Sequence, residues 1–216
     1  IYSESNLPVR TIKELVDLIH EIDINGQGKK VDYLGRIYEY FISNFAATEG
    51  NRGGEFFTPA SVVELLVQML NPQEGIVYDP ACGTGGIFIQ SNKYGKKGMK
   101  FIGQEQNCKT IMLAYMNGVL HGLDLQIKNG DTLLDDRFHE LKADYVISNP
   151  PFNMKDWGAE QLPEDDPRVF GKINKNNDNY MWMQHFIYHL KEDGKAGFVI
   201  SNGALTSSNE ADFDTR

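Results

Sequence analysis

The sequence predicts an α/β protein built on a doubly wound, mostly parallel sheet. First, short apolar runs alternate with segments of helical periodicity from about residue 60 onward. Second, a glycine-rich turn lies between one such run and a helix. Third, two consecutive prolines end a later apolar run, and a strand cannot continue there because proline lacks an N–H. Ligands of such folds bind at the carboxyl ends of the strands, so we expect a site there.

The individual elements follow from periodicity and from capping residues. We expect Thr58 as the N-cap and Pro59 as the first residue of the helix that follows. Helices are expected over residues 8–24, 33–45, 60–70, 86–94, 109–121 and 180–190, and strands over 76–78, 101–103, 125–127, 145–148 and 196–201. A long loop over 153–179 separates two of these elements, and loops of that length are uncommon unless they are functional or disordered.

Composition fits one good-sized globular domain or a domain with an appendage. The chain has 216 residues, of which 41% are hydrophobic and 24% charged. No apolar run approaches the ~20 residues of a membrane span, and the first residues do not form a signal peptide. Two cysteines, Cys82 and Cys108, favour a reducing compartment without disulfides. From the start at Ile1, without Met, we expect either that a longer protein was trimmed or that the sequence covers only its ordered part.

The net charge of −9 limits how the chain could bind nucleic acid. A protein that gripped DNA alone would usually be basic, so phosphate contacts would come from local patches or from a partner. One lysine cluster could supply such a patch, with a solvated helix end and turn as the alternative. It consists of Lys93, Lys96, Lys97 and Lys100.

The glycine-rich turn over residues 79–86 opens a helix directly after a strand. Gly83, Gly85 and Gly86 let the backbone approach a ligand, with the N–H groups of the helix end behind it. A dinucleotide fingerprint needs glycine where this chain has Phe88, and the phosphate-binding pattern ending in Gly-Lys-Ser/Thr is missing. The ligand is therefore not expected to be a pyrophosphate, but it should carry a small anionic group.

Two carboxylates stand at the ends of the next two strands. Glu105 could accept both hydroxyls of a ribose, and Asp131 could accept from the amino group of an adenine. Either acid alone is more often a cap or turn residue. Together, at successive strand ends, they predict an adenosine site.

Asn149, Pro150, Pro151 and Phe152 follow the strand expected over 145–148. Their backbone offers carbonyl acceptors, Asn149 adds an amide oxygen, and Phe152 adds a flat apolar face. This combination suits a planar ring with an exocyclic NH2 group, which would stack on Phe152 and donate to Asn149 and to the Pro150 carbonyl. The alternative is an ordinary Asn-Pro-Pro turn with a buried phenylalanine.

The motifs at 53–59 (Gly-Gly-Glu-Phe-Phe-Thr-Pro), 79–86 and 149–152, in this order, resemble those of N6-adenine DNA methyltransferases. More closely, the chain is similar to the modification (methyltransferase) subunit of type I restriction–modification systems, from about Tyr33 to its last residue. The resemblance implies a class I S-adenosylmethionine-dependent methyltransferase core over 46–216, lacking its last strands. It also implies that residues 1–45 are the end of a larger helical domain.

The resemblance assigns a role to each motif. The residues implied to bind S-adenosyl-L-methionine are Glu55, Phe56, Phe57, Thr58, Pro59, Ala60, Asp79, Gly83, Thr84, Gly85, Gly86, Glu105 (ribose) and Asp131 (adenine). The residues implied to act on the target amine are Asn149, Pro150, Pro151 and Phe152. The implied partners are double-stranded DNA, a DNA-specificity subunit and a restriction subunit, with two modification subunits per complex in the cytoplasm of a bacterium or archaeon. At 175–179 the chain departs from the family's Ala-Asp pattern.

Other functions stay open at this point. The enzyme could methylate a glutamine amide or an RNA base, or this part of the chain could bind cofactor and stay inactive until a specificity subunit joins it. Cys82 lies in the glycine turn and is not expected to be a nucleophile. His185 and His189 are four residues apart but lack the glutamate of a zinc-binding His-Glu-x-x-His motif, because position 186 is Phe. We therefore expect ordinary helix packing there and no metal.

Overall fold

The computed structural model describes residues 8–21, 37–38, 40–41, 58–96 and 98–201. Most of the helical stripe expected over 33–45 lies outside these ranges, as do three of the predicted cofactor residues, Glu55, Phe56 and Phe57.

The described chain folds around a five-stranded sheet in the order β3-β2-β1-β4-β5. The strands are β1 (Ile76–Asp79), β2 (Lys100–Glu105), β3 (Leu125–Asn129), β4 (Ala143–Ser148) and β5 (Leu190–Phe198). Every neighbouring pair is parallel. The direction in which the chain adds strands reverses between β1 and β4, so the sheet is doubly wound as predicted, with its topological switch point there.

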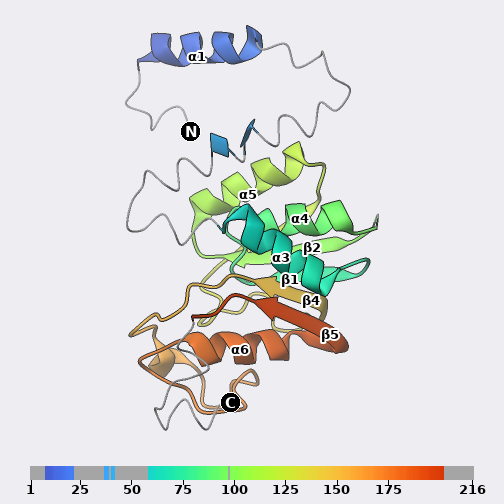
Figure 1. Ribbon diagram of the computed structural model, residues 1–216. Coiled ribbons are helices and arrows are strands. Elements are labelled where there is room, and N and C mark those ends of the chain that lie inside the picture. Colours follow the sequence, from blue (N-terminus) through green and yellow to red (C-terminus); the bar gives the residue numbers. More distant parts are fainter. Residues whose placement is uncertain (1–7, 22–36, 39, 42–57, 97, 202–216) are drawn as a thin grey trace.

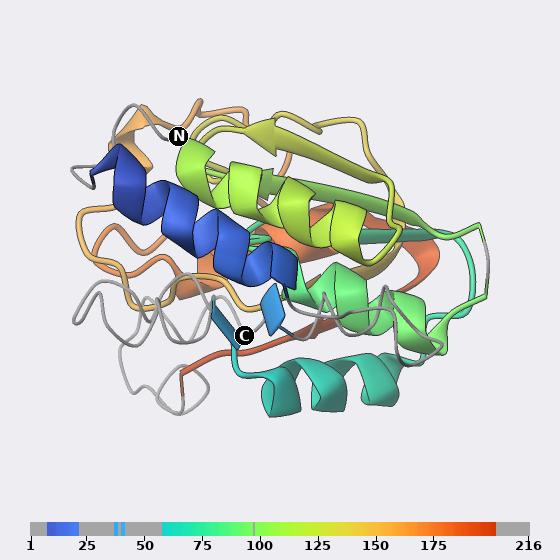
Figure 2. The same ribbon diagram turned by 90° about the horizontal axis from the view of Figure 1, so that it is seen from above.

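Helices cover both faces of the sheet (Figure 1). They are α1 (Val9–Glu21), α3 (Ala60–Leu70), α4 (Gly86–Tyr94), α5 (Cys108–Leu120), the short 3-10 helix η4 (Ala159–Gln161) and α6 (Asn179–Tyr188). Helices α3, α4 and α5 lie on one face and α6 on the other, whereas α1 lies apart from the sheet on the α5 side (Figures 1 and 2). Within the described ranges, no helix combines the length and the apolar character needed to cross a bilayer.

The core has two layers because successive strand residues point to opposite faces of the sheet. Val77 and Ile147 pack in the cluster under α3, α4 and α5, whereas Tyr78 and Val146 pack in the cluster under α6. Burial of one large apolar side chain contributes about 1.5–3 kcal/mol, so both layers stabilise the sheet. This two-sided burial explains why the strands are near-continuous apolar runs in the sequence.

The last strand differs from its prediction, which placed it over 196–201. Strand β5 begins earlier, where Leu190 pairs with Ala143, and after a shift in register Ala196 pairs with Val146. The stretch between these two points is charged, so apolar periodicity marks only the second half of the strand.

Candidate active site

The carboxyl ends of β1 and β4 are joined by a side-chain hydrogen bond. Ser148 Oγ donates to Asp79 Oδ1 at 2.7 Å, and both side chains are buried. Because Tyr78 pairs with Val146 in the sheet, the two strands end level with each other. The glycine turn (residues 79–86) and the double-proline corner (residues 149–152) therefore leave the sheet side by side at the switch point.

The glycine turn has the backbone that its sequence predicts. Gly83 and Gly85 have φ angles of 52° and 79°, in the left-handed region that favours glycine, and Gly85 is the N-cap of α4. A Cβ added to Gly86 would meet no atom within 4 Å. The first turn of α4, whose N–H groups have no acceptor within the helix, thus borders open space that a ligand can enter.

Glu105 is tied to this turn, as its place on the neighbouring strand predicts. Its Oε2 accepts from Gly83 N at 3.1 Å, and its Oε1 accepts from Asn107 N at 2.8 Å. Burial raises the pKa of the Glu105 carboxyl, and these backbone hydrogen bonds partly oppose the rise. Each oxygen retains a lone pair, so the carboxylate could still accept ligand hydroxyls.

Asp79 is the most strongly perturbed acid at the switch point. Burial raises the pKa of the Asp79 carboxyl to about 7, hydrogen bonds from Ser148 and Ala81 N oppose the rise, and the charge of Glu105 adds to it. A positively charged ligand group beside Asp79 would draw the carboxyl back to its ionised form.

Asp131 lies in a turn that touches the glycine turn. Its Oδ1 accepts from Leu133 N at 3.0 Å and from Leu134 N at 3.2 Å, so the carboxylate does cap a turn. The next residue, Thr132, donates its hydroxyl to the Pro80 carbonyl. Contact with an adenine stays a prediction.

Asn149 keeps one side-chain atom without a partner. Its Nδ2 donates to Thr58 Oγ1 at 3.1 Å, whereas Oδ1 is buried and accepts no hydrogen bond from any described residue. A buried acceptor of this kind costs about 1–3 kcal/mol. Pro150 is buried and Pro151 half-buried, but Phe152 is 37% exposed and is thus not the buried ring of an ordinary turn.

An unpartnered atom does not by itself mark a site. In the described residues Ser91 Oγ, Asn117 Oδ1 and Gln184 Nε2 are also buried without partners. The Asn149 oxygen is distinguished by its place at the switch point, one residue from the Ser148–Asp79 hydrogen bond.

The prediction for the start of α3 is wrong by one residue. Pro59, rather than Thr58, is the N-cap residue, and Ala60 begins the helix. The Thr58 hydroxyl instead accepts from Asn149 Nδ2, 91 residues further along the chain. Local sequence could not indicate this contact, which brings Thr58 to residues 149–152, the target-amine motif.

A small apolar pocket lies beside Phe152. It is lined by the double-proline corner, by α6 and by the end of β5, and its members include Pro150, Phe152, Trp182, Met183, Val199 and Ile200.

The predicted lysine cluster lies at the other edge of the sheet. Lys93 is in the last turn of α4, and Lys100 begins β2, so both lie at the amino ends of the strands. Both are exposed, as is Lys96, whereas Lys97 lies outside the described residues. This placement favours the solvated-turn alternative over a DNA contact near the site.

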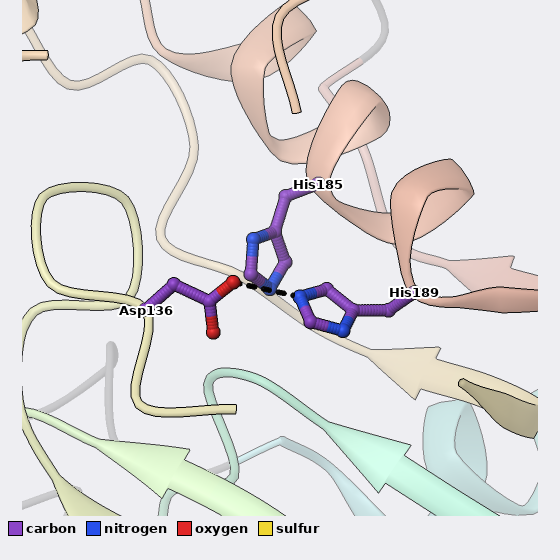
Figure 3. Close-up of side chains that lie close together, drawn as sticks. All are labelled: Asp136, His185 and His189. Atoms are coloured by element: carbon purple, nitrogen blue, oxygen red, sulfur yellow. Dashed lines mark hydrogen bonds and ion pairs between the residues drawn. The ribbon is translucent and has the colours of Figure 1, made fainter. Parts of the chain in front are cut away.

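Beneath the sheet, Asp136, His185 and His189 place one potential metal-ligand atom each within 4.8 Å of one another (Figure 3). His189 Nε2 pairs with Asp136 Oδ2 at 2.9 Å, and His189 Nδ1 lies 2.9 Å from the Leu141 carbonyl oxygen. Both ring nitrogens of His189 therefore have a hydrogen-bond partner within the protein. Burial alone would raise the pKa of Asp136, but the hydrogen bond from His189 and the two rings bring it down to about 2.

The second ring of this cluster is fixed by an arginine. Arg168 Nη1 lies 3.4 Å from His185 Nδ1, and the guanidinium can only donate, so Nδ1 accepts and Nε2 carries the proton toward the Tyr78 hydroxyl at 3.3 Å. Burial holds the pKa of His185 well below its usual range. The cluster is thus a closed polar network, consistent with the helix packing predicted for the two histidines. Sequence reasoning missed Asp136 and Arg168 because neither stands at a recognisable spacing from them.

Comparison with known proteins gives a consistent picture. A model of the N-6 DNA methylase family matches residues 29–213. The type I restriction enzyme MjaIX methylase subunit of Methanocaldococcus jannaschii is 38% identical, over 97% of this chain and 40% of that protein. The crystal structure of the type I restriction-modification system methyltransferase subunit from Streptococcus thermophilus has a TM-score of 0.82 at 31% identity, over 94% of this chain and 46% of the other. The chain spans less than half the length of either relative.

A more distant structure bears on the fold alone. A putative class I S-adenosylmethionine-dependent methyltransferase from Listeria monocytogenes has a TM-score of 0.63 at 15% identity, over 90% of this chain and 59% of that one. With the parallel order of the sheet, this likeness confirms the predicted class I fold.

Proposed function

The chain belongs to the N-6 DNA methylase family, and on that premise we propose that it is the methyl-transferring part of a type I modification subunit. The reaction is transfer of a methyl group from S-adenosyl-L-methionine to N6 of an adenine in duplex DNA. The observation that carries the proposal is the Asn149 amide oxygen, a buried acceptor without a partner in the described residues, placed beside the glycine turn.

The cofactor supplies an electrophilic methyl group on a sulfonium. The residues around the glycine turn fit such a molecule, because the open space at Gly86 lies in front of a helix N-terminus that favours a carboxylate. Glu105 would accept the ribose hydroxyls, and Asp131 would accept from the adenine amino group. Asp79 would face the positively charged groups of the cofactor. Thr58, Pro59 and Ala60, with the preceding 55–57, would border the methionine end.

The target base must leave the duplex, because its N6 is unreachable inside the stack, and flipping costs a few kcal/mol. Phe152 would receive the base by stacking, worth about 1–3 kcal/mol. Phe152 is 37% exposed, so part of its surface is accessible to a ligand. Asn149 Oδ1 and the Pro150 carbonyl would accept the two hydrogens of the amine.

These acceptors also address the chemical difficulty. The lone pair on N6 is delocalised into the ring, so the amine is a poor nucleophile. Acceptors held out of the ring plane at Asn149 and Pro150 favour a pyramidal nitrogen and localise the lone pair, which is preorganised electrostatics combined with positioning. Asn149 cannot take a proton, so the proton leaves the nitrogen for solvent after methylation.

The charge of the chain and the names of its relatives support the partners that we propose. With a net charge of −9, the chain needs phosphate contacts from elsewhere, and a DNA-specificity subunit would supply them. We propose that the chain works in a complex with the DNA-specificity subunit, a restriction subunit and a second modification subunit. The proposed location is the cytoplasm of a bacterium or archaeon. Alone, the chain should bind cofactor measurably and DNA only weakly, with affinity that falls steeply with salt.

The test is methyl transfer from tritiated cofactor by the assembled complex, with duplex DNA, RNA and protein as competing acceptors. Label in DNA that is recovered as N6-methyladenine after nucleoside digestion supports the proposal. Label in a glutamine side chain or an RNA base would move the activity to the alternative class of planar amines, which the same acceptors could bind.

A further inference from the structure

Two buried side chains at the start of α6 hold the backbone that follows Phe152. Asn179 Oδ1 accepts from Asn153 N at 2.9 Å, and Asp178 Oδ1 accepts from Met154 N at 2.9 Å. Asp178 is 1% exposed and Asn179 is 4% exposed. The first two peptide N–H groups beyond the target-amine motif are therefore both bound by one helix end.

Asn153 has an unusual conformation that makes this possible. Its φ of 63° lies in the left-handed region, which asparagine tolerates better than most residues. The side chain is fixed as well, because Asn153 Oδ1 accepts from Asn179 Nδ2 at 3.0 Å and from Ser201 Oγ at 3.1 Å. Backbone and side chain of Asn153 are thus both held against the α6 end.

We call Asp178 and Asn179, with their hydrogen bonds to residues 153 and 154, the clamp. The clamp is anchored in the core. Asp178 Oδ2 accepts from Trp182 Nε1 at 2.9 Å, and Trp182 is packed under the sheet with Met181 and Phe186. Both oxygens of the Asp178 carboxylate are therefore used, one by the loop and one by the helix. A displacement of the loop would have to break a bond to a buried acid.

The double-proline corner is consequently fixed at both ends. At one end Ser148 joins β4 to Asp79, and at the other end Asp178 and Asn179 hold residues 153 and 154. Phe152 lies between these fixed points, exposed on the surface. Two prolines keep the intervening backbone stiff.

We propose that Asp178 and Asn179 are positioning residues for the target amine, acting through the backbone at 153 and 154 and touching no substrate themselves. The inference rests on the proposed function, because it takes Phe152 and Asn149 as the groups that hold the amine. It also gives a role to part of the 175–179 stretch, where the sequence departs from the family pattern.

Two nearly isosteric variants test the clamp. In D178N one carboxylate oxygen becomes an NH2 group, which must face the N–H of either Met154 or Trp182, so one of the two bonds is lost. In N179D the donor toward Asn153 Oδ1 becomes an acceptor, so two oxygens oppose each other. The matched control is E160Q, which removes the same charge as D178N from an exposed position in the same loop.

Three readouts are needed, on the complete complex with its specificity subunit. We expect kcat for DNA methylation at saturating cofactor to fall roughly 10- to 100-fold in D178N and N179D, the loss typical of a reacting group misplaced by about 1 Å. Cofactor affinity should match that of E160Q. Hydrogen exchange at the amides of Asn153 and Met154 should accelerate, while exchange in the sheet stays slow.

The outcomes separate the clamp from the function. Wild-type exchange at residues 153 and 154 with wild-type kcat in both variants would overturn the inference, as would exchange that accelerates throughout the sheet, which marks a purely structural role. If the wild-type complex methylates an amine other than adenine N6, the proposed function fails. The same exchange and kcat comparison with that amine then decides the clamp.

Discussion

Two buried polar regions of the molecule differ in whether their hydrogen-bonding groups are satisfied. On the α6 side of the sheet, every ring nitrogen of His185 and His189 has a hydrogen-bond partner. Asp136 is one of these partners (Figure 3), and Arg168 and Tyr78 are two others. At the switch point, Asn149 uses its amide N–H and leaves its oxygen without a partner in the described residues. A closed network stabilises a fold, whereas an open acceptor costs stability, and the cost is recovered when a ligand donates to it.

The largest effect is expected when the unpartnered acceptor at Asn149 is removed. In N149A we expect methyl transfer to fall about 1000-fold, since loss of one preorganised group that binds a reacting centre has effects of that order. Cofactor affinity should not fall. The free energy of unfolding should change little, because loss of the hydrogen bond from Asn149 Nδ2 to Thr58 is offset by removal of a buried oxygen without a partner. Single-turnover methylation, cofactor titration and urea unfolding measure these three quantities. Substantial methylation by N149A would show that the open acceptor has no role in the reaction.

The next largest effect is expected when the closed network of Asp136, His185 and His189 is disrupted. In D136N the buried partner of His189 loses its charge, and we expect the free energy of unfolding to drop by about 3 kcal/mol, as when other buried pairs are broken. The control is D135N, because the neighbouring Asp135 pairs with Arg137 at the surface, where a salt bridge contributes less than about 1 kcal/mol.

The Asp136 pair also has a pH signature. The folded-state pKa of Asp136 is about 2, below its ordinary value of 3.8, so its stabilisation is present above about pH 4 and is lost as the pH falls toward 2. Urea unfolding at a series of acid pH values should show a shallower loss of stability in D136N than in the wild type. Equal slopes in the two proteins would mean that the pair does not contribute.

A further test concerns Asp79. Its pKa is raised to about 7, whereas that of Asp136 is lowered. If positive cofactor groups face this carboxyl, binding requires the ionised form. Affinity for the cofactor should then rise with pH up to about 7, by at most about tenfold per pH unit, and stay level above it. Isothermal titration between pH 5.5 and 8.5 measures this dependence. A pH-independent affinity would remove Asp79 from the cofactor site.

The smallest expected effect concerns Thr58. In T58V the hydroxyl that accepts from Asn149 Nδ2 is lost, and the amide can turn. We expect turnover to fall about 5- to 10-fold, which corresponds to one hydrogen bond of about 1–1.5 kcal/mol. T58S keeps the hydroxyl and should retain most of the activity. Equal activity of T58V and T58S would show that this contact does not orient Asn149.

How far the sequence predicts each region depends on the range of the contacts involved. The glycine turn and the double-proline corner are set by local backbone chemistry, and alternating apolar runs give the parallel sheet that brings them together. The partners of Asn149, His189 and Met154 lie 91, 53 and 24 residues away, so no local pattern predicts them. For the same reason the sequence predicted Thr58 as a helix cap and gave no sign of its contact with Asn149.

The central claim is that the glycine turn aims a methyl group at an amine bound by Asn149 and Pro150. A crystal structure of the chain with sinefungin, a cofactor analogue that carries an amine in place of the transferable methyl group, tests it most directly. We predict that this amine lies within hydrogen-bonding distance of Asn149 Oδ1 or the Pro150 carbonyl oxygen, with the ribose at Glu105. An analogue bound at the glycine turn with its amine directed away from both oxygens would contradict the account.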